Sequence, residues 1–170
     1  MSNLNDQIRA VAWVDDVLHL LDQRYLPAKE ETLVISDCQV AADAIRDMVV
    51  RGAPAIGITA AYAAVLAARA RFAADAGDWR SGFQQDLAVL NQARPTAVNL
   101  GWAVQRMRGK AQTLEGDPVP ALLQLARSIH EQDIQANRTM GELGAGFIDT
   151  GSGVLTHCNT GSLATGGYGT

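Results

Sequence analysis

The stretch APAIGITAAYAAVLAA, residues 53–68, carries no charged side chain and is the most membrane-like part of the sequence. A membrane-spanning helix needs roughly 20 apolar residues, so this run is too short. It also contains Gly57, and Pro54 stands near its start, where a helix has no use for the missing proline N–H. We therefore predict a helix buried inside the fold, running from the Ala53-Pro54 pair to about Ala74.

The segments before this helix predict a small antiparallel sheet and one further helix. Short runs of β-prone residues occur at 11–14, 17–21 and 32–35. Asp15-Asp16, between the first two runs, indicates a tight turn. From Val40 the apolar spacing changes to three and four, which predicts a helix that ends near Val50. Ser36 or Asp37 can serve as its N-cap.

Three more helices are predicted after the buried run. Two of them cover about 79–93 and 98–112, and Arg94-Pro95 separates them because a residue before proline is pushed out of the α region. Asp117-Pro118 suits the N-cap and first position of a long third helix. That helix carries an apolar stripe made of Val119, Leu122, Ala126, Ile129, Ala136, Met140, Leu143 and Phe147. Asp133 lies in the same stripe, either as an ordinary flanking polar residue or at a domain junction.

The predicted fold class is α/β, in three parts. Residues 1–115 form a small N-terminal antiparallel sheet plus a helical domain, and residues 116–150 form a connecting helix. Residues 151–170 supply a turn, a strand at 154–157 and a polar loop. We expect that strand to be the first of a truncated Rossmann-like domain whose remainder is absent.

Composition excludes several classes of function. The chain has 170 residues and a formal net charge of −4, and its 14 Lys and Arg residues form no basic stripe, so nucleic acid is not an expected partner. The N-terminus lacks a basic region followed by an apolar core, so we expect a cytoplasmic protein with no membrane partner. Cys38 and Cys158 are expected to be free thiols. The three histidines lack metal-ligand spacing, and no nucleotide-binding fingerprint fits, so we predict no metal and no cofactor.

Three positions could carry chemistry. Cys158 follows the predicted strand among hydrogen-bonding neighbours, where it is either a functional thiol or a small buried one. Arg51-Gly52-Ala53 precedes a helix, where it either binds an anion or forms a helix–helix corner. Arg94 stands in a helix break as a second anion ligand or an exposed surface arginine. Two arginines at helix breaks suit a phosphorylated or carboxylated small molecule.

Four motifs, in this order, resemble the S-methyl-5-thioribose-1-phosphate isomerase family. They are LDQRYLP at 21–27, MVVRGAPAIG at 48–57, RPTAVNL at 94–100 and LTHCNTG at 155–161. The resemblance covers essentially the whole chain but only the first half of such an enzyme. The wider family includes ribose-1,5-bisphosphate isomerases and regulatory subunits of the eukaryotic translation-initiation guanine-exchange factor. The cysteine-containing form of the last motif resembles the isomerase branch.

The resemblance implies an aldose–ketose isomerisation of 5-methylthioribose 1-phosphate in methionine salvage, with no cofactor. By this analogy Cys158 is catalytic, Arg51, Gly52, Ala53 and Arg94 bind the sugar phosphate, and the full-length protein is a homodimer. The family's catalytic aspartate lies beyond Thr170, so the chain alone is expected to be inactive. A non-catalytic regulatory or interaction module of the same family, or an isomerase of another pentose 1-phosphate, is the alternative.

Overall fold

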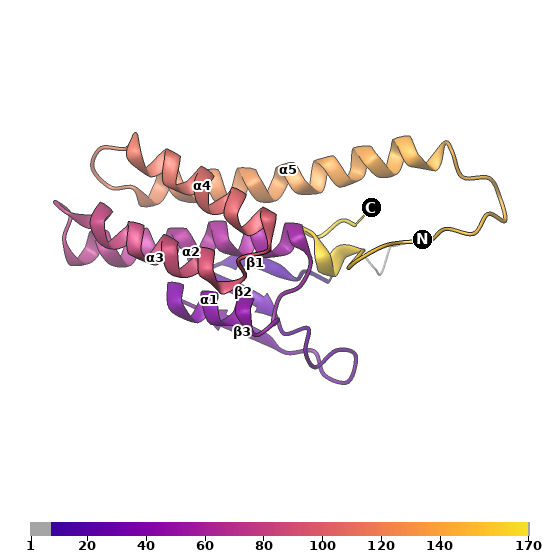
Figure 1. Ribbon diagram of the computed structural model, residues 1–170, viewed down its shortest axis with the longest axis horizontal. Coiled ribbons are helices and arrows are strands. Elements are labelled where there is room, and N and C mark those ends of the chain that lie inside the picture. The colour runs from indigo at the N-terminus through magenta and orange to yellow at the C-terminus, as the bar shows by residue number, and fades with distance from the viewer. Residues whose placement is uncertain (1–7, 170) are drawn as a thin grey trace.

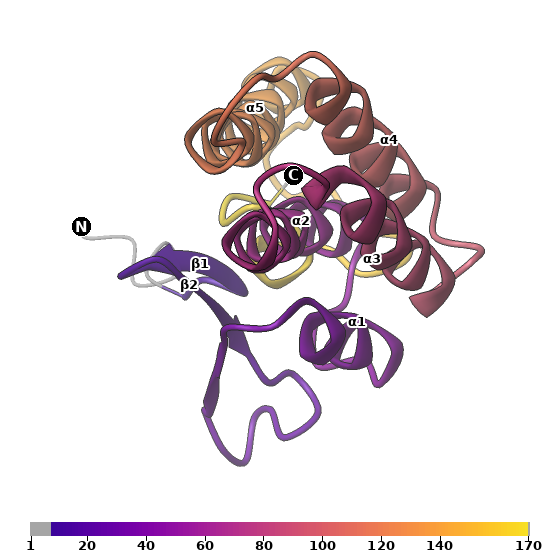
Figure 2. The same cartoon turned by 90° about the vertical axis from the view of Figure 1, so that its left-hand side faces the viewer.

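A computed structural model describes residues 8–169 of the chain. Figure 2 looks along the helices and shows α2 in the middle, with the sheet on one side and the other helices around it. α2 contacts α1, α3, α4 and α5 as well as strands β1 and β2. The fold is thus α/β, with a three-stranded antiparallel sheet and five α-helices in the described part of the chain.

The sheet forms where the β-prone runs predict it. β1 (Val11–Val14) pairs antiparallel with β2 (Val17–Leu21), which pairs antiparallel with β3 (Thr32–Ile35). Asp15 and Asp16 both have positive φ, 47° and 61°, and form the predicted tight turn. A two-residue loop of this kind matches the right-handed twist of the strands it joins.

The uncharged run forms α2 (Ala53–Ala74), and every residue from 55 to 68 is buried. Its length and composition would allow it to cross a membrane, but 78% of its most apolar window is buried inside the protein. A helix that is apolar all round belongs in a core, because each of its faces needs a covering neighbour. Close packing is visible at Gly57, where a Cβ would lie 2.9 Å from the carbonyl oxygen of Asn99. The prediction of a buried helix is confirmed.

α1 (Cys38–Arg46) begins as predicted and ends earlier than predicted. The Asp37 carboxylate caps its start by accepting hydrogen bonds from the N–H groups of Gln39 and Val40. The helix stops because Met48 takes a left-handed φ of 60°. The N–H groups of residues 48 and 49 then bond back to carbonyls of the last helical turn, which closes the helix end.

α3 (Trp79–Ala93) and α4 (Val98–Gln112) match the predicted ranges. α5 is Val119–Ala145, so it begins one residue later than the Asp117-Pro118 pair predicts. The Asp117 carboxylate nevertheless accepts a hydrogen bond from the Val119 N–H at 2.9 Å. The side chain therefore caps the helix as expected, although the boundary is shifted.

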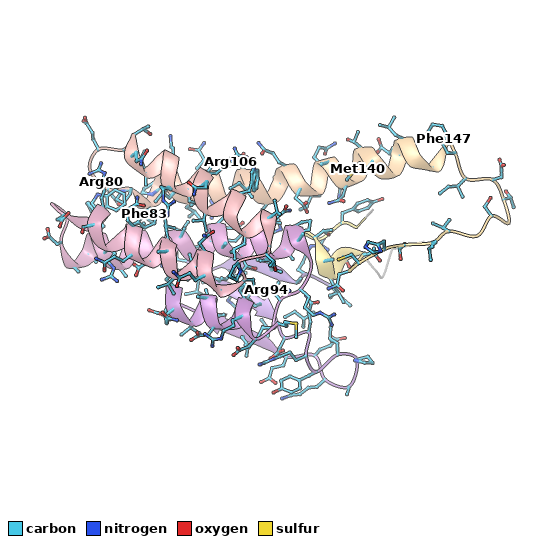
Figure 3. The ribbon with its side chains drawn as sticks, viewed as in Figure 1. Arg80, Phe83, Arg94, Arg106, Met140 and Phe147 are labelled. Atoms are coloured by element: carbon cyan, nitrogen blue, oxygen red, sulfur yellow. The ribbon has the colours of Figure 1, made fainter. Side chains whose placement is uncertain are left out.

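The apolar stripe of α5 is buried only in its first half. Leu122, Ala126 and Ile129 are in the core, whereas Phe147, just beyond the end of the helix, is 90% exposed. Figure 1 shows that α5 extends beyond the other helices, and Figure 3 labels Met140 and Phe147 in and just after that part. The second half of the stripe is thus not covered by the described residues.

The strand predicted at residues 154–157 is wrong for this structure. Residues 152–157 have no regular secondary structure, and Leu155 is 97% exposed. A strand needs a neighbour to pair its backbone N–H and C=O groups. The described chain places no strand beside this segment, and the sheet of three consists of β1, β2 and β3. The start of a Rossmann-like domain is therefore not seen.

Candidate active site

The chain returns to the start of α2 after the exposed segment. Residues 161–169 include a short 3₁₀ helix, Ser162–Ala164, which contacts α2. Ala164 lies so close to Gly52 that a Cβ at Gly52 would come within 2.5 Å of the Ala164 Cα. Figure 1 shows this segment in yellow at the end of the helical body where α2 begins. The contact brings the Cys158 region to the Arg51-Gly52 corner.

A cavity of about 330 Å³ lies at this junction, and both Arg51 and Cys158 line it. The other lining residues come from the loop after β2 and from the C-terminal segment: Gln23, Leu26, Asn159, Thr160, Leu163 and Ala164. Gln23 fixes one wall, because its Nε2 donates to the Leu163 carbonyl at 2.8 Å. Two residues predicted independently as functional, one a thiol and one a cation, thus share one cavity.

Cys158 presents an exposed thiol on an unusual backbone conformation. Its φ is 64°, in the left-handed region that non-glycine residues seldom adopt. Such conformations are enriched at functional sites, where the surrounding structure holds them. Because Cys158 is exposed and Cys38 is buried, both as free thiols, only the first is open to a small molecule.

Arg51 stands directly before Gly52, the N-cap of α2, and no side chain caps this helix end. The first backbone bond of the helix runs from the Ile56 N–H to the Gly52 carbonyl. The N–H groups of Ala53 and Ala55 therefore have no intrahelical acceptor. Together with the Arg51 guanidinium and the positive end of the helix dipole, they suit an anion.

Three of the predicted ligands, Gly52, Ala53 and Arg94, are not among the residues that line the cavity. Arg94 is half-buried at the C-terminal end of α3. Figure 3 labels Arg94 in the link between α3 and α4. Because α3 runs back along α2, this link lies at the same end of the helical body as Gly52. The ligand role of Arg94 stays a prediction.

Sequence reasoning assigned no role to Gln23 and Leu26, although both belong to the LDQRYLP motif. The neighbouring Asp22 is fully buried and accepts hydrogen bonds from the backbone N–H, Nε and Nη2 of Arg24. This ion pair folds the loop so that Gln23 faces the cavity. The motif was the signal that could have identified the loop as part of the site.

We expect the Asp22–Arg24 pair to make stability depend on acid pH. The hydrogen bonds from Arg24 lower the pKa of Asp22 below its ordinary value. A carboxyl whose pKa is lower in the folded state contributes stability that is complete above its unfolded pKa and is lost as pH falls through the folded pKa. Asp22→Asn should cost about 1 kcal/mol near neutral pH and nothing in strong acid. Urea unfolding at several pH values tests this, and a difference that does not shrink in acid would contradict it.

A second cavity, of about 360 Å³, lies between the first turns of α2 and α4 and the middle of α5. Its walls are mostly apolar and include Pro54, Ile58, Val98 and Trp102, and Asp133 also lines it. Burial raises the pKa of Asp133. This cavity is larger but contains neither Cys158 nor Arg51, so we place the chemistry in the smaller one. Among residues 8–169, no group of three or more His, Cys, Asp and Glu side chains is arranged to hold a metal.

Residues 49–166 match the Initiation factor 2 subunit family. The match spans most of the chain, including Arg51 and Cys158, so the chain belongs to this family. Within it, the chain is 60% identical over 166 residues to a methylthioribose-1-phosphate isomerase from Alkalilimnicola ehrlichii, covering 98% of the chain and 48% of that protein. It is 58% identical to the enzyme of the same name from Nitrosococcus oceani, covering 100% of the chain and 49% of that protein.

Solved structures agree with this relationship. The crystal structure of 5-methylthioribose 1-phosphate isomerase from Pyrococcus horikoshii matches with a TM-score of 0.87 at 36% identity, covering 95% of the chain and 46% of that protein. The delta subunit of translation initiation factor eIF-2B from A. fulgidus matches with a TM-score of 0.82 at 39% identity, covering 93% and 47%. The chain therefore spans about half the length of the relatives that it matches.

Proposed function

We propose that this chain is the N-terminal half of an aldose–ketose isomerase that converts 5-methylthioribose 1-phosphate to 5-methylthioribulose 1-phosphate in methionine salvage. The names of the relatives support the reaction. The observation that carries the proposal is the cavity shared by Arg51 and Cys158 at the start of α2. The reaction would need no metal or nucleotide cofactor.

The substrate phosphate would bind at the start of α2. Arg51 and the N–H groups at Gly52 and Ala53 supply positive charge and donors, and Arg94 would reach the same anion from the α3–α4 link. Cys158 would then lie beside the sugar. Binding the phosphate, which does not react, fixes the orientation of C1 and C2.

The chemistry requires proton transfers that Cys158 alone cannot complete. Phosphate on the anomeric oxygen prevents the ring from opening as a free sugar would, so the bond between C1 and the ring oxygen must break. The ring oxygen gains a proton, hydrogen moves from C2 to C1, and the C2 hydroxyl loses its proton to become the ketone. These steps need an acid and a base, so a second group must act with Cys158. We propose that the second group is an aspartate in the other half of the enzyme.

A fused protein tests the proposal. Residues 1–169 would be joined to the second half of the Alkalilimnicola ehrlichii relative, and ketose formation would be followed with methylthioribose 1-phosphate. We expect turnover by the fusion and none by the 170-residue chain alone. The relative itself is the positive control. A folded but inactive fusion, or a chain that turns over alone at the rate of the relative, would count against the proposal.

The similarity to the eIF-2B delta subunit supports a second candidate function, that of a non-catalytic interaction module. Such a module would bind a partner without using the thiol. Another pentose 1-phosphate is a further candidate substrate, and a panel of 5-methylthio, 5-deoxy and 5-phospho sugars would separate these activities. We also propose a cytoplasmic location and a homodimer for the whole protein. The exposed half of the α5 stripe supports the proposal that further sequence covers it, with residues 151–170 beginning a Rossmann-like domain.

A further inference from the structure

Two side chains of α5 hold the peptide groups on either side of Gly166. The Gly166 N–H donates to the Asp133 Oδ2 at 2.6 Å, and the Gly166 carbonyl bonds to the His130 Nε2 at 2.6 Å. Positions 130 and 133 are one helical turn apart, so both side chains leave the same face of α5. The C-terminal segment is thus bound to α5 through its backbone, whatever side chains it carries elsewhere.

The Gly166 carbonyl fixes one proton on the His130 ring. A carbonyl oxygen only accepts, so the Nε2 must carry the proton that bonds to Gly166. In the neutral ring the Nδ1 is then an acceptor, and the Tyr62 hydroxyl lies 3.1 Å from it. Burial raises the pKa of Tyr62 to about 12, so this hydroxyl keeps its proton and can donate it. A chain of hydrogen bonds therefore runs from the core helix α2 through α5 to the C-terminal segment.

Only glycine fits at position 166. A Cβ there would lie 2.7 Å from the His130 Cδ2 and 3.1 Å from the Asp133 Oδ2. Two positions away, Ala164 is pressed against Gly52 at the start of α2. The segment is thus fixed at two points, by α5 on one side and by the Arg51-Gly52 corner on the other.

We propose that His130 and Asp133 are positioning residues that hold the C-terminal segment so that Cys158 faces Arg51 across the cavity. This inference rests on the proposed function, because it assigns the two side chains to the site formed by Cys158 and Arg51. They lie on α5 and act through Gly166. The arrangement explains why Asp133, a carboxylate in an apolar stripe, is half-buried in the fold.

A paramagnetic label on Cys158 tests the positioning without substrate. Cys38 is buried, so a thiol-reactive nitroxide attaches to Cys158, and its proximity broadens the NMR signals of the Arg51 and Gly52 amides. We expect Asp133→Ala and His130→Ala to weaken this broadening severalfold. Hydrogen exchange at the Gly166 amide should become about 10- to 100-fold faster in Asp133→Ala, the range expected for one lost hydrogen bond to a charged group.

The controls separate positioning from general destabilisation. Asp133→Asn keeps an acceptor oxygen and should restore most of both signals. Glu131→Ala makes the same change of charge at an exposed neighbouring position and should match the wild type. Slow exchange at the α2 amides reports an intact core. If Asp133→Ala also loses that protection, Gly166→Ala tests the same contact from the loop side, because its Cβ would collide with His130.

The outcomes distinguish this inference from the proposed function. Unchanged broadening in folded Asp133→Ala or Gly166→Ala would overturn the positioning role, whether or not the fused enzyme is active. If the fusion turns over, we expect Asp133→Ala to lower its kcat about tenfold and Asp133→Asn to recover most of that loss. A kcat that stays at the wild-type value while the broadening is lost would also overturn it. An inactive fusion with the expected broadening would count against the proposed function alone.

Discussion

Gly52→Ala is expected to detach residues 161–169 from the start of α2 and to destabilise the chain by about 2–6 kcal/mol. Two independent effects add. Gly52 has φ 95° and ψ 136°, an extended backbone conformation with positive φ that is essentially restricted to glycine and costs an L-residue about 1–3 kcal/mol. The new Cβ would also lie 2.5 Å from the Cα and carbonyl oxygen of Ala164, so backbone atoms would have to move. Urea denaturation and the nitroxide label on Cys158 would measure the two consequences.

Gly116→Ala is the matched control for this experiment. Gly116 also has a positive φ, 69°, but a Cβ there would meet nothing within 4 Å. It therefore reports the backbone strain without the collision. The excess loss in Gly52→Ala combines the collision with Ala164 and the more restricted backbone of Gly52, and only that variant should weaken the broadening at Arg51. Equal losses of stability in the two variants would show that the contact contributes nothing.

The fold could be predicted wherever local chemistry fixes the backbone. Pro95 separates α3 from α4, and Asp15-Asp16 forms the tight turn between β1 and β2. The uncharged run around Tyr62 lacks any polar face, so it predicts a helix in the core. The predictions were less accurate where distant contacts decide. The first helix stops at a left-handed Met48, a conformation that the residue type does not announce. The strand at 154–157 has the right composition for pairing but no neighbouring strand among the described residues.

The candidate site likewise has features that the local sequence predicts and features that depend on long-range contacts. Cys158 and Arg51 were each identifiable from their neighbours, but no local pattern relates two positions so far apart in sequence. Their shared cavity depends on Gly52 accepting Ala164 and on α5 holding Gly166, which are long-range contacts. Asp133 was noticed only as a polar residue in an apolar stripe. Its partner, a backbone N–H, leaves no mark in the sequence except the glycine that makes room for it.

Cys158→Ser is expected to lower the kcat of the fused enzyme by about 10²–10⁴, the range for losing a proton-transfer group, while leaving KM within a few-fold. Serine keeps the shape and the hydrogen-bonding capacity of cysteine, but its hydroxyl gives up a proton far less readily than a thiol. The phosphate ligands at the start of α2 are untouched, so binding should persist. Steady-state kinetics with methylthioribose 1-phosphate would measure both constants.

Cys38→Ala is the control, because it removes the other thiol at a site remote from the cavity chemistry. Burial raises the pKa of Cys38 to about 12, so near neutral pH iodoacetamide should modify Cys158 and leave Cys38 unmodified. Inactivation of the fusion should therefore follow the labelling of Cys158, and Cys38→Ala should be inactivated at the same rate. If Cys158→Ser keeps the turnover of the parent fusion, the thiol is not part of the chemistry. The left-handed φ of 64° at Cys158 would then serve the path of the loop, and the interaction module would become the better account of this half of the fold.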